Sequence, residues 1–238
     1  MVKTEISCTK RLSEKDIHEA YLLFCRFYSN VNLENFISDL SEKNWMIRVV
    51  DNGRLVGFST QQLIELQING KTTYFLFSGD TIVDPGYWSK NQLGGAFIHL
   101  FLHVINIRKT PLYWFLITKG FRTYRFLPVF FKRFYPSYTN NNQDLKPLLD
   151  AVASHKFQDE YNPNTELVTY KSGKDRFDNK YAEIPESRRK SKNVNYFIKR
   201  NPEYSAGVEL ACITRLSKDS LTDAGIRLMD SAKLDWNV

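Results

Sequence analysis

The stretch FSGDTIVDPGYWSKNQLGGAFIHLFLHV, residues 77–104, contains the residue types and spacings best suited to chemistry. Asp80 is an acid in an otherwise apolar run, where a carboxylate could take a proton as a general base. The glycine before it also fits a second interpretation, in which Asp80 belongs to a β-bulge. Further along, Gly94 and Gly95 open a predicted helix, and the free N–H groups of a helix start bind anions such as phosphate. The stretch therefore places a candidate proton acceptor close to the start of a predicted helix.

The other potentially reactive side chains give weaker evidence for a functional site. His99 and His103 have the i, i+4 spacing of two metal ligands, but no Glu follows His99 and no third ligand is apparent. A packed or partly exposed helix face is the favoured interpretation, and no metal is expected. Cys25 and Cys212 are expected to be buried core thiols. With Cys8 they make three widely spaced cysteines, which predict neither a disulfide framework nor a zinc site.

Composition limits the class of protein. The chain has 238 residues, of which 42% are hydrophobic and 25% charged, which excludes a disordered or low-complexity chain. A net charge of +7 favours an acidic partner such as nucleic acid, a membrane surface, a phosphate group or an acidic protein. The N-terminus lacks an apolar secretory signal, and the longest apolar run, 93–107, is too short to span a bilayer. We expect a soluble, cytoplasmic protein in a reducing compartment.

The elements that must position these residues follow from hydrophobic spacing and turn signals. Proline and glycine at 85–86 end a three-strand meander, and a β-α-β crossover follows it. The predicted strands are 5–10, 45–50, 54–66, 71–83, 112–118 and 207–216. The predicted helices are 13–28 (capped by Ser13 and Asp16), 33–43, 91–107, two short ones joined at 127–128, 143–156 and 217–233. Residues 158–192 are polar and irregular, and the basic run 188–192 is expected to be a solvated loop. The order predicts one α+β (mixed α/β) domain over 1–238.

Residues 77–104 resemble the central strand, loop and helix of the GNAT acyltransferases. In that family a strand ends in Val-x-Pro, and a loop of the form Gln/Arg-x-x-Gly-x-Gly/Ala opens a helix that binds the pyrophosphate of coenzyme A. Here Val83-Asp84-Pro85 matches the strand end. With a three-residue insertion, Gly94 and Ala96 match the glycines and Asn91 stands for Gln/Arg. The resemblance covers roughly residues 3–138, and the polar loop 158–192 with a late strand and helix makes up most of the rest.

The resemblance implies a GNAT-like fold and an acyl thioester held between strands 71–83 and 112–118. A backbone N–H near Val83 would polarise the thioester carbonyl. A tyrosine after the second strand would protonate the leaving thiolate, with Tyr124 the nearest match and Tyr135 and Tyr138 as reserves. Asp80 would be the base. The residues placed around the donor are Ile82, Val83, Trp88, Ser89, Lys90, Asn91, Gln92, Leu93, Gly94 and Gly95. The degenerate loop leaves coenzyme A and the phosphopantetheine of an acidic carrier protein open as donors.

Aromatic residues are concentrated after the second strand. Between Leu112 and Tyr138, 11 of 27 residues are aromatic, five are basic and none is acidic. Such a segment could be core, could lie against a membrane or nucleic acid, or could line an acyl pocket beside the thioester. The residues predicted for that pocket are Trp114, Phe115, Phe121, Phe126, Phe130 and Phe131.

Three functions follow from this segment. The first is an N-acyltransferase that moves a medium or long fatty acyl group to an amine of a small molecule, amino acid or peptide. The GNAT-like enzymes that make N-acyl amino acids or lipidate peptides do such chemistry. The second is an N-acetyltransferase that uses acetyl-CoA. The third is a non-catalytic basic aromatic module that binds an acidic partner.

Overall fold

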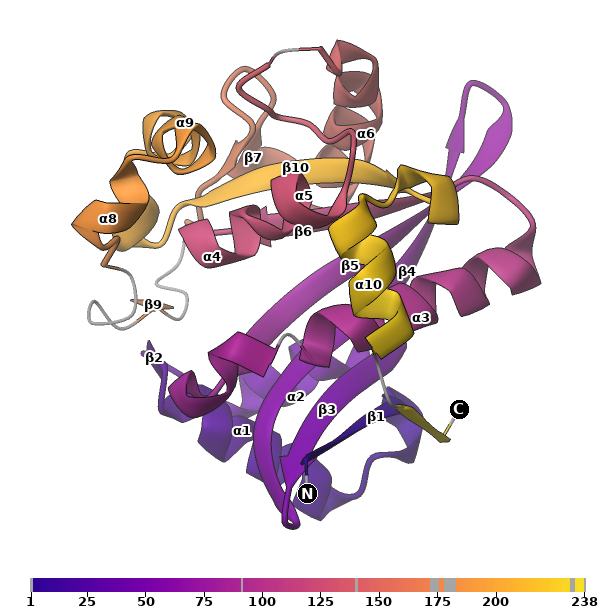
Figure 1. The fold of residues 1–238 in the computed structure, drawn as a ribbon, viewed down its shortest axis with the longest axis vertical. Coiled ribbons are helices and arrows are strands. Elements are labelled where there is room, and N and C mark those ends of the chain that lie inside the picture. The colour runs from indigo at the N-terminus through magenta and orange to yellow at the C-terminus, as the bar shows by residue number, and fades with distance from the viewer. Residues whose placement is uncertain are drawn as a thin grey trace.

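A nine-stranded sheet forms the centre of the molecule in the computed structural model (Figure 1). The structure describes residues 2–90, 92–139, 141–171, 176–177, 183–231 and 234–237. The strand order is β11-β1-β3-β4-β5-β6-β10-β8-β7, in which only β1/β11 and β5/β6 pair in parallel. The sheet strands are β1 (Val2–Cys8), β3 (Trp45–Asp51), β4 (Arg54–Ile68), β5 (Lys71–Val83), β6 (Leu112–Thr118), β7 (Tyr161–Asn162), β8 (Leu167–Val168), β10 (Glu209–Leu216) and β11 (Leu234–Asn237). The predicted mixed α/β class with a mostly antiparallel sheet is confirmed.

The meander β3-β4-β5 is built by two tight turns. Asn52 and Gly53 have φ of 49° and 80°, and Asn69 and Gly70 have φ of 50° and 73°. Two consecutive positive φ values give a type I′ turn, whose twist matches that of the strands on either side. The Asn-Gly signals therefore place the long strands β4 and β5 side by side in antiparallel register.

The crossover after β5 returns the chain parallel to it. The 3-10 helix η2 (Pro85–Lys90) leads into α3 (Gln92–Arg108), and β6 then pairs with β5 from Tyr74↔Leu112 to Ser78↔Leu116. A parallel pair needs such a crossover connection. The predicted bounds of β5 and β6 are confirmed.

Alternation along the strands gives the sheet two differently covered faces. On one face Leu76, Trp114 and Leu116 pack with α3, α4 (Phe121–Tyr124), α5 (Phe126–Phe130), α9 (Lys192–Arg200) and α10 (Asp223–Ser231). On the other face Phe75, Phe77 and Phe115 pack with α6 (Lys146–Phe157), while Met46, Phe58 and Ile82 pack with α1 (Glu14–Cys25) and α2 (Leu33–Ser41). Different helices therefore meet the two faces of β5 and β6.

The helix at the N-terminus begins as its sequence predicts. The Ser13 side chain accepts from the Asp16 N–H and the Asp16 carboxylate accepts from the Ser13 N–H, so the predicted capping box is confirmed. The helix ends at Cys25, earlier than expected. Cys25 is exposed, so the prediction of a buried thiol was wrong there, because Ala20, Leu23 and Phe24 face the core. Cys212 is fully buried, as predicted.

The segment after β6 differs in detail from its prediction. The two short helices meet at Arg125, and Pro128 lies in the first turn of α5, where a missing N–H costs nothing. The sequence did not predict five elements of the C-terminal half, namely β7, β8, α8 (Glu186–Arg189), α9 and β11. It also did not predict the two-stranded pair of β2 (Tyr28–Ser29), near the N-terminus, with β9 (Arg176–Phe177). The basic run 188–192 is mostly helical and not a loop, because Arg188 and Arg189 end α8 and Lys192 begins α9. Residues 188–190 are exposed, as expected. No helix of the described residues is long and apolar enough to cross a membrane.

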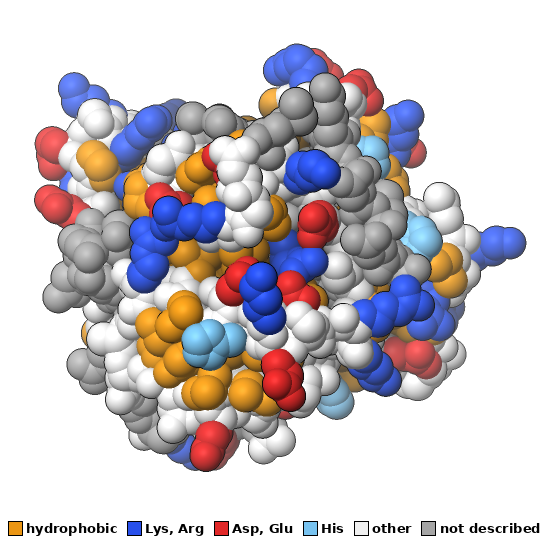
Figure 2. All heavy atoms as spheres, turned by 90° about the horizontal axis from the view of Figure 1, so that it is seen from below, with side chains coloured by type: hydrophobic (Ala, Val, Ile, Leu, Met, Phe, Trp, Pro, Cys, Tyr) orange, Lys and Arg blue, Asp and Glu red, His pale blue; other side chains and the backbone are white. Residues whose placement is uncertain are grey.

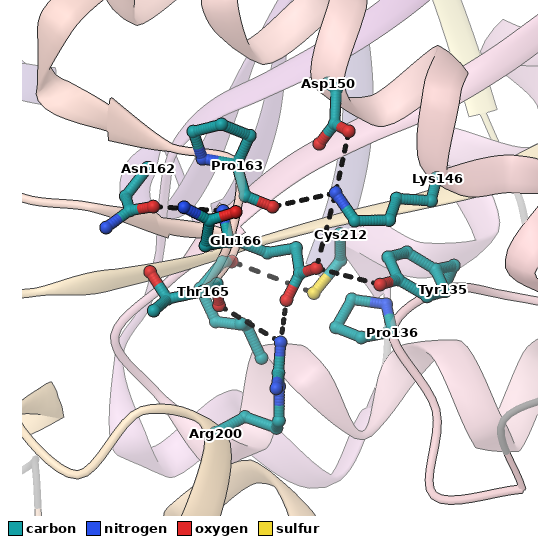
Figure 3. Close-up of polar contacts among 12 residues, drawn as sticks. Tyr135, Pro136, Lys146, Asp150, Asn162, Pro163, Thr165, Glu166, Arg200 and Cys212 are labelled. Atoms are coloured by element: carbon teal, nitrogen blue, oxygen red, sulfur yellow. Dashed lines mark hydrogen bonds and ion pairs between the residues drawn. The ribbon is translucent and has the colours of Figure 1, made fainter.

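A group of ionic side chains around the buried Glu166, the Glu166 cluster (Tyr135, Lys146, Asp150, Glu166 and Arg200), fastens this half to the sheet (Figure 3). Glu166 is 2% exposed. Its Oε1 accepts a 2.8 Å hydrogen bond from the Tyr135 hydroxyl and lies 3.7 Å from Lys146 Nζ, and its Oε2 pairs with Arg200. Lys146 also pairs with Asp150 at 2.7 Å. The cluster ties α6 and α9 to the turn between β7 and β8.

Candidate functional site

A gap opens in the sheet between β5 and β6. Their pairing ends at Ser78↔Leu116. Beyond it, β5 stays paired with β4 as far as Val83, and β6 stays paired with β10 as far as Thr118. The two strands therefore diverge while each keeps its other neighbour, which is the separation that the GNAT resemblance implies.

A bulge in β5 lies beside this gap. The β4/β5 register changes between Gln61↔Ser78 and Ser59↔Thr81, so β5 has one extra residue at Gly79-Asp80. A Cβ on Gly79 would lie 2.7 Å from Thr60 Oγ1 and 2.8 Å from Lys43 Cε, so this backbone needs glycine. The bulge interpretation of Asp80 is confirmed, and the same residue also lines the cavity described below.

Backbone donors face the gap beyond the bulge. The Asp84 N–H donates to Val56 O at 2.8 Å, toward β4. In an antiparallel ladder, alternate residues point their N–H groups to opposite sides. The N–H groups of Thr81 and Val83 therefore point away from β4, to the side from which β6 has diverged. The predicted oxyanion donor, the Val83 N–H, therefore faces the side of β5 that borders the gap, although Val83 is not among the residues that line the cavity described below.

A cavity of about 550 Å³ occupies the gap and reaches both faces of the sheet. From the α3 face it is lined by Leu93, Gly94, Phe97, Trp114, Leu116 and Phe126. From the opposite face it is lined by Phe24, Phe36, Asp39, Glu42, Phe77, Lys156 and Phe157. Asp80 lines it from the bulge. This volume lies within the range of small-molecule sites.

Charged side chains mark the opening between α2 and α6. Asp39 and Glu42 line the cavity with side chains 44% and 54% exposed. Asp39 pairs with Lys43 at 2.7 Å, and Glu42 pairs with Lys156 at 2.8 Å. Figure 2 views the end of the molecule that carries α1 and α2, where acidic and basic side chains are interspersed beside a hydrophobic group. The cavity therefore opens to solvent among charged groups on this side.

A hydrogen-bonded series, the Ser78 chain (Ser59, Gln61, Ser78, Thr81 and Trp114), crosses β4, β5 and β6 where the gap begins. Trp114 Nε1 donates to Ser78 Oγ at 2.8 Å, Ser78 Oγ donates to Gln61 Oε1 at 2.7 Å, and Gln61 Nε2 donates to Ser59 Oγ at 2.7 Å. Ser59 Oγ lies 2.8 Å from Thr81 Oγ1. All five residues line the cavity. Sequence analysis missed four of them, although STQQ at 59–62 interrupts an apolar strand and is a visible signal.

The residues predicted for the donor lie between the end of β5 and the start of α3. Ile82 is buried against α1 and α2, whereas Leu93 and Gly94 line the cavity. Trp88 donates from Nε1 to Val83 O at 2.7 Å and stacks under the Arg122 guanidinium at 4.3 Å. Asn91 and the side chains of Ser89 and Lys90 lie outside the described residues. Gln92 and Gly95 belong to the first turn of α3, with Gly95 buried.

Positive charge collects beside this loop. Burial and the neighbouring Arg188 guanidinium both lower the pKa of Arg122. Arg122 and Arg188 are therefore neighbouring positive charges, and the Arg122 guanidinium lies over the Trp88 ring.

The tyrosines predicted as acids lie elsewhere. Tyr124 is fully buried, and its hydroxyl donates to Pro136 O at 3.0 Å. Burial raises its pKa above the ordinary value. It is not among the described residues that line the cavity. Tyr135 belongs to the Glu166 cluster, and Tyr138 is 47% exposed. The role of Tyr124 as the acid stays a prediction.

The aromatic residues predicted for an acyl pocket divide into two groups. Trp114 and Phe126 line the cavity. Phe115 packs against Phe157 beneath α6, and Phe121, Phe130 and Phe131 pack in the core on the α3 face. Much of the aromatic excess at 112–138 is therefore core in this structure. Of the two histidines of α3, His99 Nε2 lies 3.0 Å from Met229 O, and no group of three metal-ligating side chains exists in the described part of the chain.

A mostly antiparallel sheet, one β-α-β crossover and a separation between two central strands are the features that the GNAT resemblance implies. No protein-family model and no curated protein sequence matches the chain. Among solved structures, the chain is similar to a probable N-acyltransferase of unknown function from Enterococcus faecalis V583, with 14% identity and a TM-score of 0.43. That overlap covers 56% of this chain and 33% of the other, so the chain spans about a third of that protein's length.

Two further solved structures show similar partial overlaps. A GNAT-family N-acetyltransferase from Escherichia coli in complex with CoA is 15% identical, with a TM-score of 0.39 over 55% of this chain and 69% of that one. N-myristoyltransferase from Saccharomyces cerevisiae with bound myristoyl-CoA is 16% identical, with a TM-score of 0.38 over 49% and 31% of the two chains.

Proposed function

We propose that the protein is an N-acyltransferase that moves an acyl group from a phosphopantetheine thioester to an amine. The observation that carries this function is the gap between β5 and β6, filled by a cavity that reaches both faces of the sheet. A thioester could enter from one face and an amine from the other, so that the two meet in the gap. Holding both reactants in one cavity removes the entropic cost of bringing them together from solution during the reaction.

The donor is assigned to the α3 side. Gly94 lets the start of α3 lie against the cavity, where free N–H groups favour phosphate. Arg122, close to Arg188, supplies positive charge beside it. The N–H groups of Thr81 and Val83 face the gap and would stabilise negative charge on the thioester oxygen. The same groups could bind coenzyme A or the phosphopantetheine of a carrier protein.

The acyl chain is assigned to the apolar part of the cavity formed by Leu93, Phe97, Trp114, Leu116 and Phe126. Each buried CH₂ contributes about 0.8 kcal/mol, so a medium or long chain would gain more than an acetyl group. This is the feature that favours a fatty acyl donor over acetyl-CoA.

Asp80 is assigned as the general base. The amine nitrogen attacks the thioester carbon, a C–N bond forms, and the C–S bond breaks with loss of the thiolate. The nitrogen must give up a proton, and the Asp80 carboxylate on the bulge lines the cavity where that proton is released. The thiolate leaves as the free thiol after taking a proton. The products are an amide and a free phosphopantetheine thiol.

Thiol release tests this function. The protein is incubated with acyl-CoAs from C2 to C16 and a mixture of amines, and with a loaded carrier protein in a parallel arm. We expect amine-dependent thiol release that is fastest with medium or long chains. Preference for acetyl-CoA would replace the fatty acyl assignment with an acetyltransferase. If no thioester releases thiol and the protein instead binds anionic vesicles or RNA in a salt-sensitive way, a binding module is the better assignment.

The role of Asp80 has its own test. Asp80→Asn keeps the size of the side chain and removes the base, so kcat should fall by about 10²- to 10⁴-fold. Asp144→Asn is the matched control, because it makes the same change at an exposed ion pair with Arg133. Equal rates for the two variants would remove Asp80 from the mechanism.

A further inference from the structure

Four of the five residues of the Ser78 chain are buried although they line the cavity, and the fifth, Thr81, is exposed. Ser59, Gln61, Ser78 and Trp114 are 5%, 1%, 8% and 5% exposed. Four hydrogen bonds between side chains connect three strands at the point where main-chain pairing of β5 and β6 ends. Buried polar groups are costly unless they are paired, and these four bonds pair the side chains with one another.

The direction of these hydrogen bonds follows from chemistry. The Trp114 indole N–H can only donate, so Ser78 Oγ accepts it. The Ser78 hydroxyl hydrogen then points to Gln61 Oε1, which can only accept. That bond orients the Gln61 amide, whose nitrogen donates to Ser59 Oγ. The hydrogen of Ser78 is therefore committed to Gln61.

One acceptor position remains on Ser78. A hydroxyl oxygen has two lone pairs, and the indole N–H uses one of them. Since its hydrogen is committed to Gln61, Ser78 can offer a ligand in the cavity a lone pair and no donor. Asp80 lines the same cavity from two residues further along β5. A carboxylate is likewise an acceptor of hydrogens.

We propose that Ser78 accepts one N–H of the substrate amine and thereby makes the site selective for primary amines. This inference rests on the proposed acyl transfer and names the acceptor class. A primary amine has two hydrogens and a lone pair, so it can donate one hydrogen to Ser78, lose the other to Asp80 and point its lone pair at the thioester carbon. A secondary amine or an alcohol has one hydrogen and leaves either Ser78 or Asp80 without a donor.

The kinetic test compares benzylamine with N-methylbenzylamine, using whichever acyl thioester the wild type accepts. In Ser78→Ala, kcat/KM for benzylamine should fall by about tenfold, the value of one lost hydrogen bond, while that for N-methylbenzylamine changes little. The ratio of the two kcat/KM values in Ser78→Ala is compared with the same ratio in the wild type, which cancels the difference in intrinsic reactivity between the two amines. KM for the thioester should not change. Thr73→Val is the control, because it removes another buried hydroxyl of β5 that is not among the cavity-lining residues.

A binding measurement in the wild type separates this inference from the function it rests on. The four tryptophans are labelled with ¹⁵N, the Trp114 indole resonance is assigned with Trp114→Phe, and each amine is titrated without a thioester. Benzylamine should shift the Trp114 resonance more than its N-methyl form does, because it bonds to the partner of the indole. A shift without any thiol release would overturn acyl transfer and keep the amine site. Thiol release with no preferential shift and an unchanged amine ratio in Ser78→Ala would overturn the role of Ser78. The titration decides the matter even if Ser78→Ala does not fold.

Discussion

Two regions of this molecule bury polar side chains, and they do so in different ways. In the Glu166 cluster, charges of opposite sign pair directly with one another, and none of its residues lines the cavity described above (Figure 3). In the Ser78 chain the side chains are neutral and all five line that cavity. The first arrangement lies away from the cavity, whereas the second leaves an acceptor position beside it.

The difference separates stability from recognition. A buried ion pair is expensive to desolvate and is strongly destabilising when one partner is lost. A neutral chain costs less to bury, and its oriented dipoles can stabilise a reacting group without rearrangement. Substitutions in the Glu166 cluster should therefore change folding free energy, and substitutions around the gap should change binding and rate.

The largest effect is expected for Glu166→Gln. The change leaves Arg200 and Lys146 near a neutral amide, and we expect the free energy of unfolding to fall by about 3–5 kcal/mol. Urea unfolding measures it. Glu186→Gln is the control, since its side chain is 90% exposed beside Arg189 and should change stability by less than about 0.5 kcal/mol. Comparable losses in the two variants would mean that the cluster contributes no more than a surface pair.

Sequence patterns predicted the half of the fold that local signals define. The Asn-Gly turns, Pro85 and Pro111 bound β4, β5 and β6, so the gap-forming strands were located correctly. The short strands β2, β9 and β11 carry no local signal because each pairs with a strand distant in sequence. Strands β7 and β8 pair with each other, but two residues are too few to show an alternating pattern. Helix α9 was missed because its composition is polar, and it packs through Val194 and Phe197.

The candidate site divides in the same way. The positions of Asp80 and Gly94 at the cavity agree with the resemblance in sequence. The Ser78 chain could not be assembled from the sequence, because the meeting of Ser59 with Thr81 depends on a bulge and that of Ser78 with Trp114 depends on where a parallel pair ends. Aromatic composition alone could not separate Phe126, on the cavity, from Phe130, in the core.

Gly94→Ala should lower the free energy of unfolding less than Glu166→Gln does, but it should also weaken binding of the acyl donor. Its Cβ would lie 2.8 Å from Phe126 Cε1 and 3.0 Å from Leu228 Cδ2. Overpacking of this kind costs about 1–3 kcal/mol, and movement of the Phe126 ring would narrow the cavity. Acyl-CoA affinity, measured by calorimetry, should fall at least about tenfold. Gly86→Ala is the control, since its nearest neighbour would be 3.9 Å away. Unchanged affinity in Gly94→Ala would move the donor away from the start of α3.

The smallest effect is expected for Tyr124→Phe. This variant tests whether Tyr124 contributes to stability, like the Glu166 cluster, or to the reaction, like the residues around the gap. Loss of the hydrogen bond to Pro136 O should cost about 1 kcal/mol at pH 7.

Burial raises the pKa of Tyr124 above 10.0, so the unfolded chain loses this proton first as the pH rises. Native stability should therefore fall above about pH 10, by up to about 1.4 kcal/mol per pH unit from this one group. The variant lacks the tyrosine hydroxyl, so the difference in free energy of unfolding between it and the wild type should shrink from pH 10 to 11, as measured by urea unfolding. Turnover should stay near that of the wild type. A more than tenfold loss of kcat at unchanged stability would instead place the hydroxyl in the chemistry, as the acid that protonates the leaving thiolate.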